Sequence, residues 1–374
     1  MRISSITKTF DRGVHRVCAD VDGEPLWFES ADVALSPSPE AFGSAMLLPA
    51  LARGETLTLE DPVSSIWRSN IRQLLFTFNE WWNYQGILPE PFHHPRQVTR
   101  ATQTALCFSG GVDSFYTLLR SEYAIHYLVF VIGFDMELDD LGRFEAFEPS
   151  LRAAADETGA QPAVIRTNLR EHSAFAPVSW ERTHGGALAA IGHMLSGVAG
   201  QLLISSTDPF SMRAPWGSHW MTDAFWSSER LQVLHVGAHV HRHCKLRAIT
   251  DEPLVRNHLR VCWENRTPAG NCSRCEKCVR TRLILADCGR LADFPAFDGE
   301  DSLPADMRAL PHTGMVRPAY QDLKQRDNLR LEIKRELSKL IARTNRHQSR
   351  LNKNPFKKIW LYEKIRNWLR RGRN

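Results

Sequence analysis

Length and composition describe a globular protein. The chain has 374 residues, 43% of them hydrophobic and 9% aromatic, which excludes wholesale disorder and leaves enough apolar surface for two or three folding units. No uninterrupted apolar run approaches the ~20 residues of a membrane-spanning helix, and the first residues carry no signal-peptide core. Eight Cys are too few for a disulfide scaffold, so we expect an intracellular, cytoplasmic protein.

The charge is distributed unevenly along the chain. The formal net charge is +5, yet residues 323–374 alone contain 17 Lys and Arg against 4 Asp and Glu. The preceding residues therefore carry an excess of acidic side chains. Any argument about anionic partners applies to this C-terminal tail and not to the rest of the chain.

Residues 1–98 are predicted to form a small α+β domain. Short apolar runs separated by turn residues predict strands, and Asp61-Pro62-Val63-Ser64 predicts the start of a helix. Trp81 and Trp82 in that helix are typical of a core, although a ligand platform is the alternative. The Pro-rich stretch 88–95 predicts a boundary to the next domain.

Residues 99–300 show a different rhythm, in which short apolar runs alternate with helical patterns. This alternation predicts an α/β domain built on a doubly wound parallel sheet. Ligands of such sheets bind beyond the carboxyl ends of the strands. The five predicted strands are 104–108, 127–133, 163–167, 201–205 and 231–236.

The hexapeptide Ser109-Gly110-Gly111-Val112-Asp113-Ser114 lies between the first of these strands and a helix. Two glycines allow backbone N–H groups to approach phosphate oxygens closely, and the start of the helix attracts the same anion. Ser109 and Ser114 add hydroxyl donors, and Asp113 can hold Mg²⁺ or orient a nucleotide. The sequence therefore predicts a nucleotide-binding loop, with an incidental glycine-rich turn as the alternative.

Four cysteines crowd into a short segment further along the domain. Cys262, Cys272, Cys275 and Cys278 have the short spacings of a tetrahedral Zn²⁺ site. Turn-forming residues between the first two favour a closed structural site with a scaffolding role. An iron–sulfur cluster and unliganded thiols are the alternatives.

The hexapeptide resembles the PP-loop, SGGxDS, of the ATP pyrophosphatase superfamily. Together with four cysteines about 150 residues later, it makes residues 100–295 similar to the 7-cyano-7-deazaguanine synthase family. The resemblance implies ATP and Mg²⁺ as cofactors, Zn²⁺ in the cysteine site, and cleavage of ATP between its α and β phosphates. It implies that a carbonyl or carboxylate of a small-molecule substrate is adenylated and then attacked by nitrogen, most simply ammonia.

Other polar residues follow the predicted strands, where a site is expected. Asp135 comes after the second strand, where related folds contact the nucleotide. His184 precedes an apolar helix, as a pocket residue or as a helix-capping or packing residue. Ser206, Asp208 and His219 follow the fourth strand and are predicted to line a substrate pocket, with the ordering of a loop as the alternative.

Arg242 and Lys245 follow the fifth predicted strand. Residues three apart lie on one face of a helical turn, so the two cations can neutralise the charge that develops on a leaving pyrophosphate. We therefore expect Arg242 and Lys245 to act with Asp113 in catalysis. Solvated basic side chains are the alternative.

Residues 301–374 are predicted to be a linker followed by a basic, amphipathic helical tail. Leu329, Ile333, Leu337, Leu340 and Ile341 recur at helical spacing, and the segment 356–374 repeats the basic theme with Trp360 and Trp368. Three interpretations of residues 323–374 remain open. The helix packs on its own body or on a partner subunit of a homo-oligomer, lies at the inner anionic membrane surface, or clamps tRNA.

The prediction for the whole chain is an ATP-dependent, AMP-forming enzyme that joins carbon to nitrogen. The first alternative is sulfur transfer to tRNA, which requires a reactive thiol near the loop, and only Cys107 and Cys244 qualify. The second alternative is a nucleotide-binding interaction protein without turnover.

Overall fold

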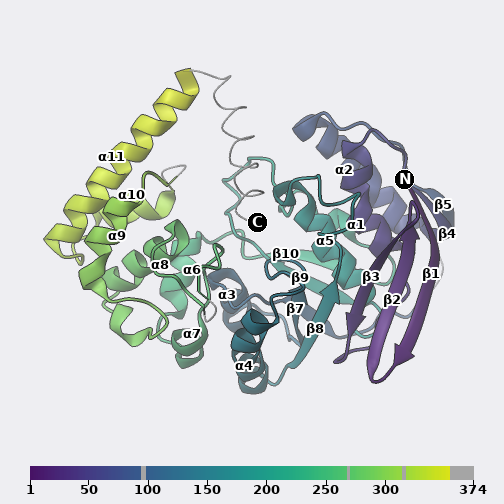
Figure 1. The fold of residues 1–374 in the computed structure, drawn as a ribbon, viewed down its shortest axis with the longest axis horizontal. Helices are drawn as coiled ribbons and strands as arrows, with labels where there is room; N and C mark the ends of the chain where they lie inside the picture. Colours follow the sequence, from purple (N-terminus) through teal and green to yellow (C-terminus); the bar gives the residue numbers. More distant parts are fainter. Residues whose placement is uncertain (94–97, 268–269, 314–316, 354–374) are drawn as a thin grey trace. The chain divides into compact units, whose positions relative to one another are not determined.

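Ten strands form one sheet in the computed structural model, which describes residues 1–93, 98–267, 270–313 and 317–353 (Figure 1). The strands in chain order are β1 (Arg2–Asp11), β2 (Val14–Val21), β3 (Glu24–Ser30), β4 (Thr58–Ser64), β5 (Glu90–His93), β6 (Thr104–Cys107), β7 (Tyr127–Ile132), β8 (Gln161–Thr167), β9 (Gln201–Ser205) and β10 (Gln232–Val236). Their order across the sheet is β10-β9-β6-β7-β8-β3-β2-β1-β4-β5.

The half of the sheet from β10 to β8 is entirely parallel. Its five strands occupy the five predicted apolar runs, which confirms the α/β class. The chain runs from β6 through β7 to β8, and then returns past β6 to form β9 and β10. The direction of travel therefore reverses between β6 and β9, and open α/β sheets bind ligands beyond the strand ends at such a reversal.

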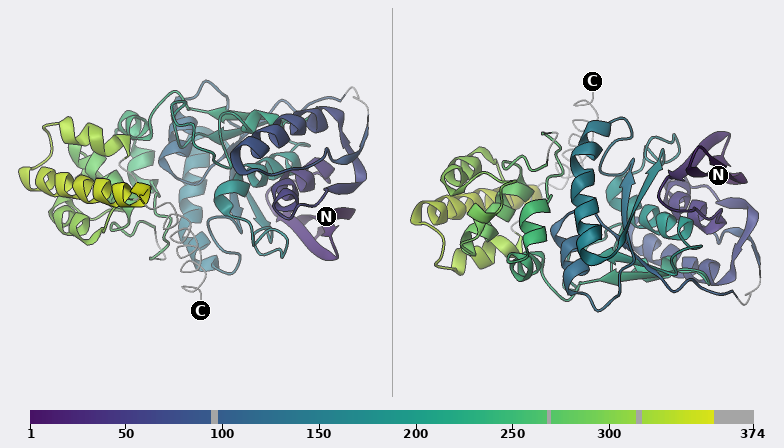
Figure 2. Two further views of the ribbon diagram at one scale, coloured as in Figure 1. Left: turned by 90° about the horizontal axis from the view of Figure 1, so that it is seen from above. Right: turned by 90° about the horizontal axis from the view of Figure 1, so that it is seen from below.

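Helices cover both faces of this parallel half, which is compatible with the predicted doubly wound arrangement (Figure 2). The helices of this part are α1 (Pro39–Ala52), α2 (Ser65–Trp82), α3 (Val112–Arg120), α4 (Leu141–Thr158), α5 (Trp180–Met194), α6 (Arg242–Ile249) and α7 (Pro253–His258), with a short 3₁₀ turn, η1 (Asp223–Trp226). One face of the sheet contacts α3 and α4. The other face shares one apolar core with α1, α2 and α5.

The N-terminal strands continue this sheet and do not form a separate domain. β3 pairs antiparallel with β8 through Phe28 and Thr167, and the fully buried Trp67 belongs to the same core as the parallel strands. Residues Met1–Arg260 therefore make one compact unit, and the structure does not divide near residue 98. Trp81 and Trp82 are half-buried against this core, which confirms their interpretation as packing residues.

The helix expected to open at Asp61 begins four residues later. Residues 61–63 belong to β4 instead, because the strand pairs with β1 and β5 at the edge of the sheet. The Ser64 hydroxyl accepts a hydrogen bond of 3.1 Å from the Trp67 N–H, so Ser64 caps α2.

The second compact unit contains Val261–Thr267 and the described residues from Asn271 onward. It is helical: α8 (Glu276–Asp287), α9 (Leu303–Ala309), α10 (Pro318–Gln325) and α11 (Leu331–Lys353), with 3₁₀ turns η2 (Leu291–Asp293) and η3 (Glu300–Ser302). The four cysteines of the predicted metal site belong to this unit, although the sequence placed them in the α/β domain.

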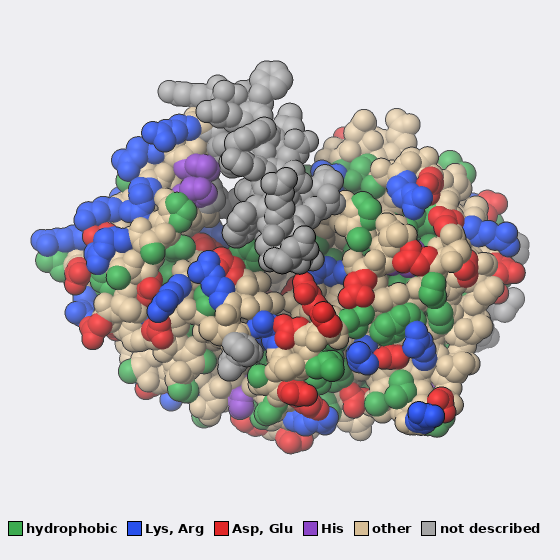
Figure 3. All heavy atoms as spheres, viewed as in Figure 1, with side chains coloured by type: hydrophobic (Ala, Val, Ile, Leu, Met, Phe, Trp, Pro, Cys, Tyr) green, Lys and Arg blue, Asp and Glu red, His purple; other side chains and the backbone are tan. Residues whose placement is uncertain are grey.

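The basic tail begins as α11, whose apolar side chains are covered by its own unit. Ile333, Leu337 and Leu340 are buried, and α11 packs against α9 and α10. Figure 3 shows Lys and Arg side chains gathered along the outer surface of α11. The segment 356–374, with Trp360 and Trp368, lies outside the described residues. Within the described residues, none of the helices combines the length and apolarity that crossing a bilayer requires.

Candidate functional site

The loop between β6 and α3 has the geometry of an anion-binding turn. Gly110 has a φ of 70°, and a Cβ at this position would lie 2.8 Å from the Phe147 ring. Gly111 is the N-cap of α3, where no side chain caps the helix. The first N–H groups of α3 are therefore left for another acceptor, and the helix dipole favours an anion there.

The serine and valine side chains of this loop take different positions. Ser109 is exposed, whereas Val112 and Ser114 are buried. Ser114 donates a hydrogen bond of 3.1 Å to the Gly111 carbonyl, so its hydroxyl supports the turn from within. The loop follows β6, and Ser205 ends the neighbouring β9, so both lie where the order of strands reverses.

Asp113, the first acidic residue of α3, meets the two predicted cations. It is 7% exposed, its Oδ2 forms an ion pair with Arg242, and its Oδ1 lies 3.5 Å from the Lys245 Nζ. Among the described residues, Oδ1 has no hydrogen-bond partner. The structure therefore brings three charged groups from α3 and α6 to the loop and leaves one buried carboxylate oxygen unsatisfied, which fits a bound metal–phosphate group.

Lys245 is the most deeply buried of these groups. Its side chain is fully inaccessible, and its Nζ donates a hydrogen bond to the Ser206 carbonyl. Burial, and to a smaller extent the charge of Arg242, lower the pKa of Lys245 from 10.5 to about 7, while Asp208 opposes the shift. Lys245 can therefore gain or lose a proton near neutral pH, according to what binds beside it.

The site residues predicted to follow β7 and β9 lie in two different environments. Asp135 is exposed at the end of β7, next to Gly133, where a Cβ would collide with the Thr167 carbonyl at 2.0 Å. Ser206 and Asp208 belong to the Lys245 environment, since one accepts from its Nζ and the other acts on its charge. These residues lie at the strand ends, as the sequence predicted.

His184 holds a loop to α5. Its Nδ1 bonds the Trp180 carbonyl at 2.9 Å, and its Nε2 accepts the Ser218 N–H at 3.1 Å. Burial lowers the pKa of His184, which keeps the ring neutral and in this one tautomer. Both ring nitrogens are occupied by backbone groups, so the packing interpretation of His184 fits better than a substrate contact.

His219 is likewise engaged by backbone on both nitrogens. Its Nε2 bonds the Met212 carbonyl at 3.2 Å and its Nδ1 accepts the Met221 N–H at 3.1 Å. Burial lowers the pKa of His219 as well. The predicted pocket residue therefore orders the loop before η1, which was the alternative that the sequence left open.

Sequence reasoning missed one polar pair beside this loop. His235, near the end of β10, forms a 2.7 Å contact through Nδ1 with Asp223, which is fully buried. The only signal was a polar residue near the carboxyl end of the run 231–236, which also contains Gln232. In a predicted strand, such a residue at the carboxyl end is a site candidate because ligands bind at that edge.

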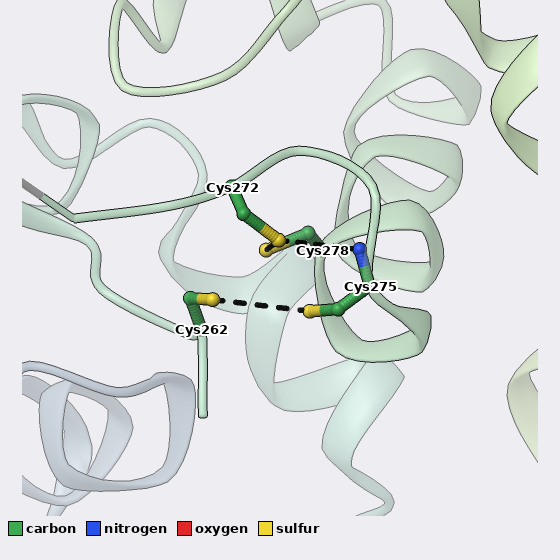
Figure 4. A group of neighbouring side chains, drawn as sticks. All are labelled: Cys262, Cys272, Cys275 and Cys278. Atoms are coloured by element: carbon green, nitrogen blue, oxygen red, sulfur yellow. Dashed lines mark hydrogen bonds between the residues drawn. The ribbon is translucent and has the colours of Figure 1, made fainter. Parts of the chain in front are cut away.

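The four cysteines converge in the second unit (Figure 4). Their sulfur atoms all lie within 4.8 Å of one another, and the Cys262–Cys275 and Cys272–Cys278 pairs are 4.0 and 3.9 Å apart. Sulfurs around a tetrahedral Zn²⁺ lie about 3.8 Å apart, given Zn–S bonds of ~2.3 Å. The cluster therefore fits a four-coordinate metal ion such as Zn²⁺.

Hydrogen bonds hold the cysteine loop in shape. The Asn271 side chain accepts the N–H groups of Val261 and Cys262 at 2.8 and 3.2 Å. The Cys275 N–H points to the Cys272 sulfur at 3.3 Å, the type of contact that stabilises a ligating thiolate. All four sulfurs come from one loop and the start of α8, so a bound ion would join these segments.

Comparison with known proteins gives no match: no protein-family model, no curated protein and no solved structure is similar to the chain. We therefore infer the function from the geometry of the chain itself. Two features of unit Met1–Arg260 carry it, namely the uncapped start of α3 and the charged group around Asp113.

Proposed function

We propose that the chain is a PP-loop ATP pyrophosphatase, which converts ATP to AMP and pyrophosphate while activating a carbonyl or carboxylate. The observation that carries this proposal is the combination at one place of an uncapped helix start, a glycine with a φ of 70°, and a buried carboxylate between two cations. Each feature suits a polyphosphate. Together they supply donors, space and charge for one.

Different residues of this site would bind the phosphates, the Mg²⁺ ion and the nucleotide. The N–H groups at the start of α3 would hold phosphate oxygens, and Arg242 and Lys245 would neutralise the leaving pyrophosphate. Asp113 would hold the Mg²⁺ that accompanies ATP, and this ion supplies charge neutralisation on the phosphates. The unsatisfied Oδ1 of Asp113 supports that role. Asp135, exposed at the next strand end, would contact the nucleotide.

The acceptor chemistry that we propose is formation of a carbon–nitrogen bond, as in the 7-cyano-7-deazaguanine synthase family. The substrate carboxylate attacks the α-phosphorus, and nitrogen then displaces AMP. Sulfur transfer would need a thiolate near the loop. Burial raises the pKa of Cys107 to about 12, so this residue, which directly precedes the loop, remains a thiol. Cys244, the other candidate thiol, is exposed on α6, so sulfur transfer would have to use that residue, whereas the nitrogen route needs no thiol near the loop.

The test is release of AMP and pyrophosphate from ATP–Mg²⁺ by the full-length protein. One reaction receives a deazaguanine carboxylic acid and ammonium, a second the small-metabolite fraction of a cell extract, and a third its tRNA and protein fraction. Asp113→Ala should lower release by about 100-fold or more, because it removes a charge that acts on the phosphates. Asp139→Ala, which removes an exposed carboxylate of the same unit, is the matched control.

The three reactions separate the candidate functions. Release driven by either small-molecule reaction supports amide or nitrile formation. Release driven only by the macromolecular fraction would replace it with modification of RNA or protein, in which the basic surface of α11 would bind the nucleic acid. ATP binding without release in any of them would contradict an enzymatic role, as would equal rates for wild type and Asp113→Ala.

We further propose that the four cysteines hold Zn²⁺ in a structural site. All four ligand positions are taken by thiolates, so no position is open for a substrate. Metal analysis of the purified protein should give one zinc per chain without sulfide. Iron accompanied by acid-labile sulfide would overturn this assignment and replace it with an iron–sulfur cluster.

A further inference from the structure

The Asp223–His235 pair differs from every other histidine contact described above. Asp223 is fully buried and accepts hydrogen bonds from the Ser218 hydroxyl at 2.7 Å, the His219 N–H at 3.0 Å and the His235 Nδ1 at 2.7 Å. A carboxylate surrounded by three donors can only accept, so the proton of the neutral imidazole lies on Nδ1. The Nε2 of His235 then carries a lone pair.

Among the described residues, the Nε2 of His235 makes no hydrogen bond. By contrast, His184 and His219 use both ring nitrogens to hold backbone groups. An imidazole whose Nδ1–H is held by a buried carboxylate presents its Nε2 lone pair in one fixed orientation, which is the arrangement of a general base.

The sheet register places His235 at the same carboxyl-end edge of the parallel strands as the proposed ATP loop, on the face that α1, α2 and α5 cover rather than the face that α3 covers. His235 pairs with Ile204 on β9, and Leu203 pairs with Leu106 on β6, so Cys107 is next in register with Ile204. In-register neighbours on parallel strands share a face, and two strand spacings span about 10 Å. Asp223 also acts electrostatically on Cys107, the last residue of β6.

We propose that His235, positioned by Asp223, is the general base for the nitrogen nucleophile. This inference rests on the proposed ATP pyrophosphatase function. Ammonia or an amine attacks the adenylated carbonyl carbon, forming the carbon–nitrogen bond. The bond from that carbon to the phosphate oxygen breaks, and AMP leaves with the electron pair. The proton released from the nitrogen passes to the Nε2 of His235, which later returns it to solvent. Asp223 is a positioning residue, since it acts only through the imidazole.

The decisive variant is His235→Asn. The Asn amide nitrogen takes the place of Nδ1 and can still donate to Asp223, while the Nε2 position is lost, so a structural role is retained and a base is removed. His126→Asn is the matched control. His126 also uses Nδ1 in a hydrogen bond, which it accepts from the Thr104 N–H, but at the amino end of β6, away from the loop.

Two half-reactions are measured with the deazaguanine carboxylic acid. ATP–pyrophosphate exchange reports adenylation, and amide formation from ammonium reports the nitrogen step. His235→Asn should keep exchange within about threefold of wild type and lose about 100-fold in amide formation. Hydroxylamine, a stronger nucleophile that needs less help from a base, should restore turnover as hydroxamate. The control variant should match wild type in all three assays.

The outcomes distinguish the two proposals. Wild-type protein that shows no pyrophosphate exchange, either with the deazaguanine carboxylic acid or with the small-metabolite fraction, overturns the proposed function and this inference with it. If wild type shows exchange and His235→Asn forms the amide as fast as wild type, the inference alone is overturned. The same holds if His235→Asn loses exchange and amide formation equally. Nitrogen-15 NMR of histidine-labelled wild type provides a test without any variant: the Nδ1–H tautomer at His235 is expected, and the Nε2–H tautomer would contradict the proposal.

Discussion

Asp113 and Arg282 are both buried charged residues, and they differ in how far their hydrogen-bonding capacity is used. Arg282, fully buried in the second unit, donates to the carbonyls of Ser273, Asp298 and Gly299 and to the side chains of Ser302 and Asp306. Asp113 has an oxygen without a hydrogen-bond partner among the described residues, next to two cations. Complete satisfaction is typical of a scaffold, whereas unused capacity beside excess charge is typical of a binding site.

This comparison predicts that changes in the second unit alter stability first, and that changes around Asp113 alter ligand binding first. The largest expected effect comes from the cysteine cluster. Cys275→Ser should abolish stoichiometric zinc binding and unfold the second unit, because the free energy of metal binding contributes directly to folding. The thermal unfolding midpoint and the zinc content, measured on the same sample, check this.

Cys288→Ser is the control for this variant. Cys288 follows α8 in the same unit but lies outside the group of four sulfurs. It should retain one zinc and a midpoint close to that of wild type. Loss of zinc from both variants, or from neither, would show that the four sulfurs do not form the metal site.

The second effect concerns Arg282 itself. Arg282→Met leaves the carboxylate of Asp306 and several carbonyls buried without their donor, so it should cost about 3–5 kcal/mol of unfolding free energy. Arg290→Met removes an exposed ion pair with Asp293, 3.3 Å long, and should cost less than about 1 kcal/mol. Denaturant titration compares the two. Similar costs for both variants would mean that the network around Arg282 does not support the unit.

The parts of the fold that sequence predicted well are those with local signals. Five apolar runs of five to seven residues predicted the parallel strands, the hexapeptide predicted the turn before α3, and the cysteine spacing predicted a cluster that the structure brings together. Each of these depends on residues that are close in the chain. Alternating apolar runs and short motifs therefore suffice for them.

The parts that it missed depend on long-range pairing. The boundary expected near residue 98 fails because β3 joins β8, which is more than 130 residues away. Likewise, nothing in the apolar run 231–236 indicates that His235 meets Asp223 across the end of β10. The environment of Lys245 is also set by distant groups, since Asp113 and Ser206 come from two other segments.

The protonation of Lys245 tests whether ATP binds at the charged groups around Asp113. In the free protein its pKa is about 7, lowered from 10.5 mainly by burial. A phosphate beside the ammonium would raise this pKa, so ATP binding should take up protons above pH 7, approaching about one proton near pH 8 to 9. Well below pH 7 the lysine is already protonated, and this uptake should fade away. Consequently, the affinity for ATP should fall as the pH rises from 7 to 9, by up to about tenfold per pH unit.

Calorimetry in two buffers of different ionisation enthalpy measures this uptake directly. Lys245→Met should bind ATP more weakly and without the proton uptake, while Lys8→Met, an exposed lysine of the same unit, should behave as wild type. If Lys245→Met took up as many protons as wild type, another group would be responsible and the phosphate would lie elsewhere. If the proton uptake is lost in Lys245→Met, the polyphosphate binds beside Lys245 and Asp113, because the two proteins differ only in the Lys245 side chain.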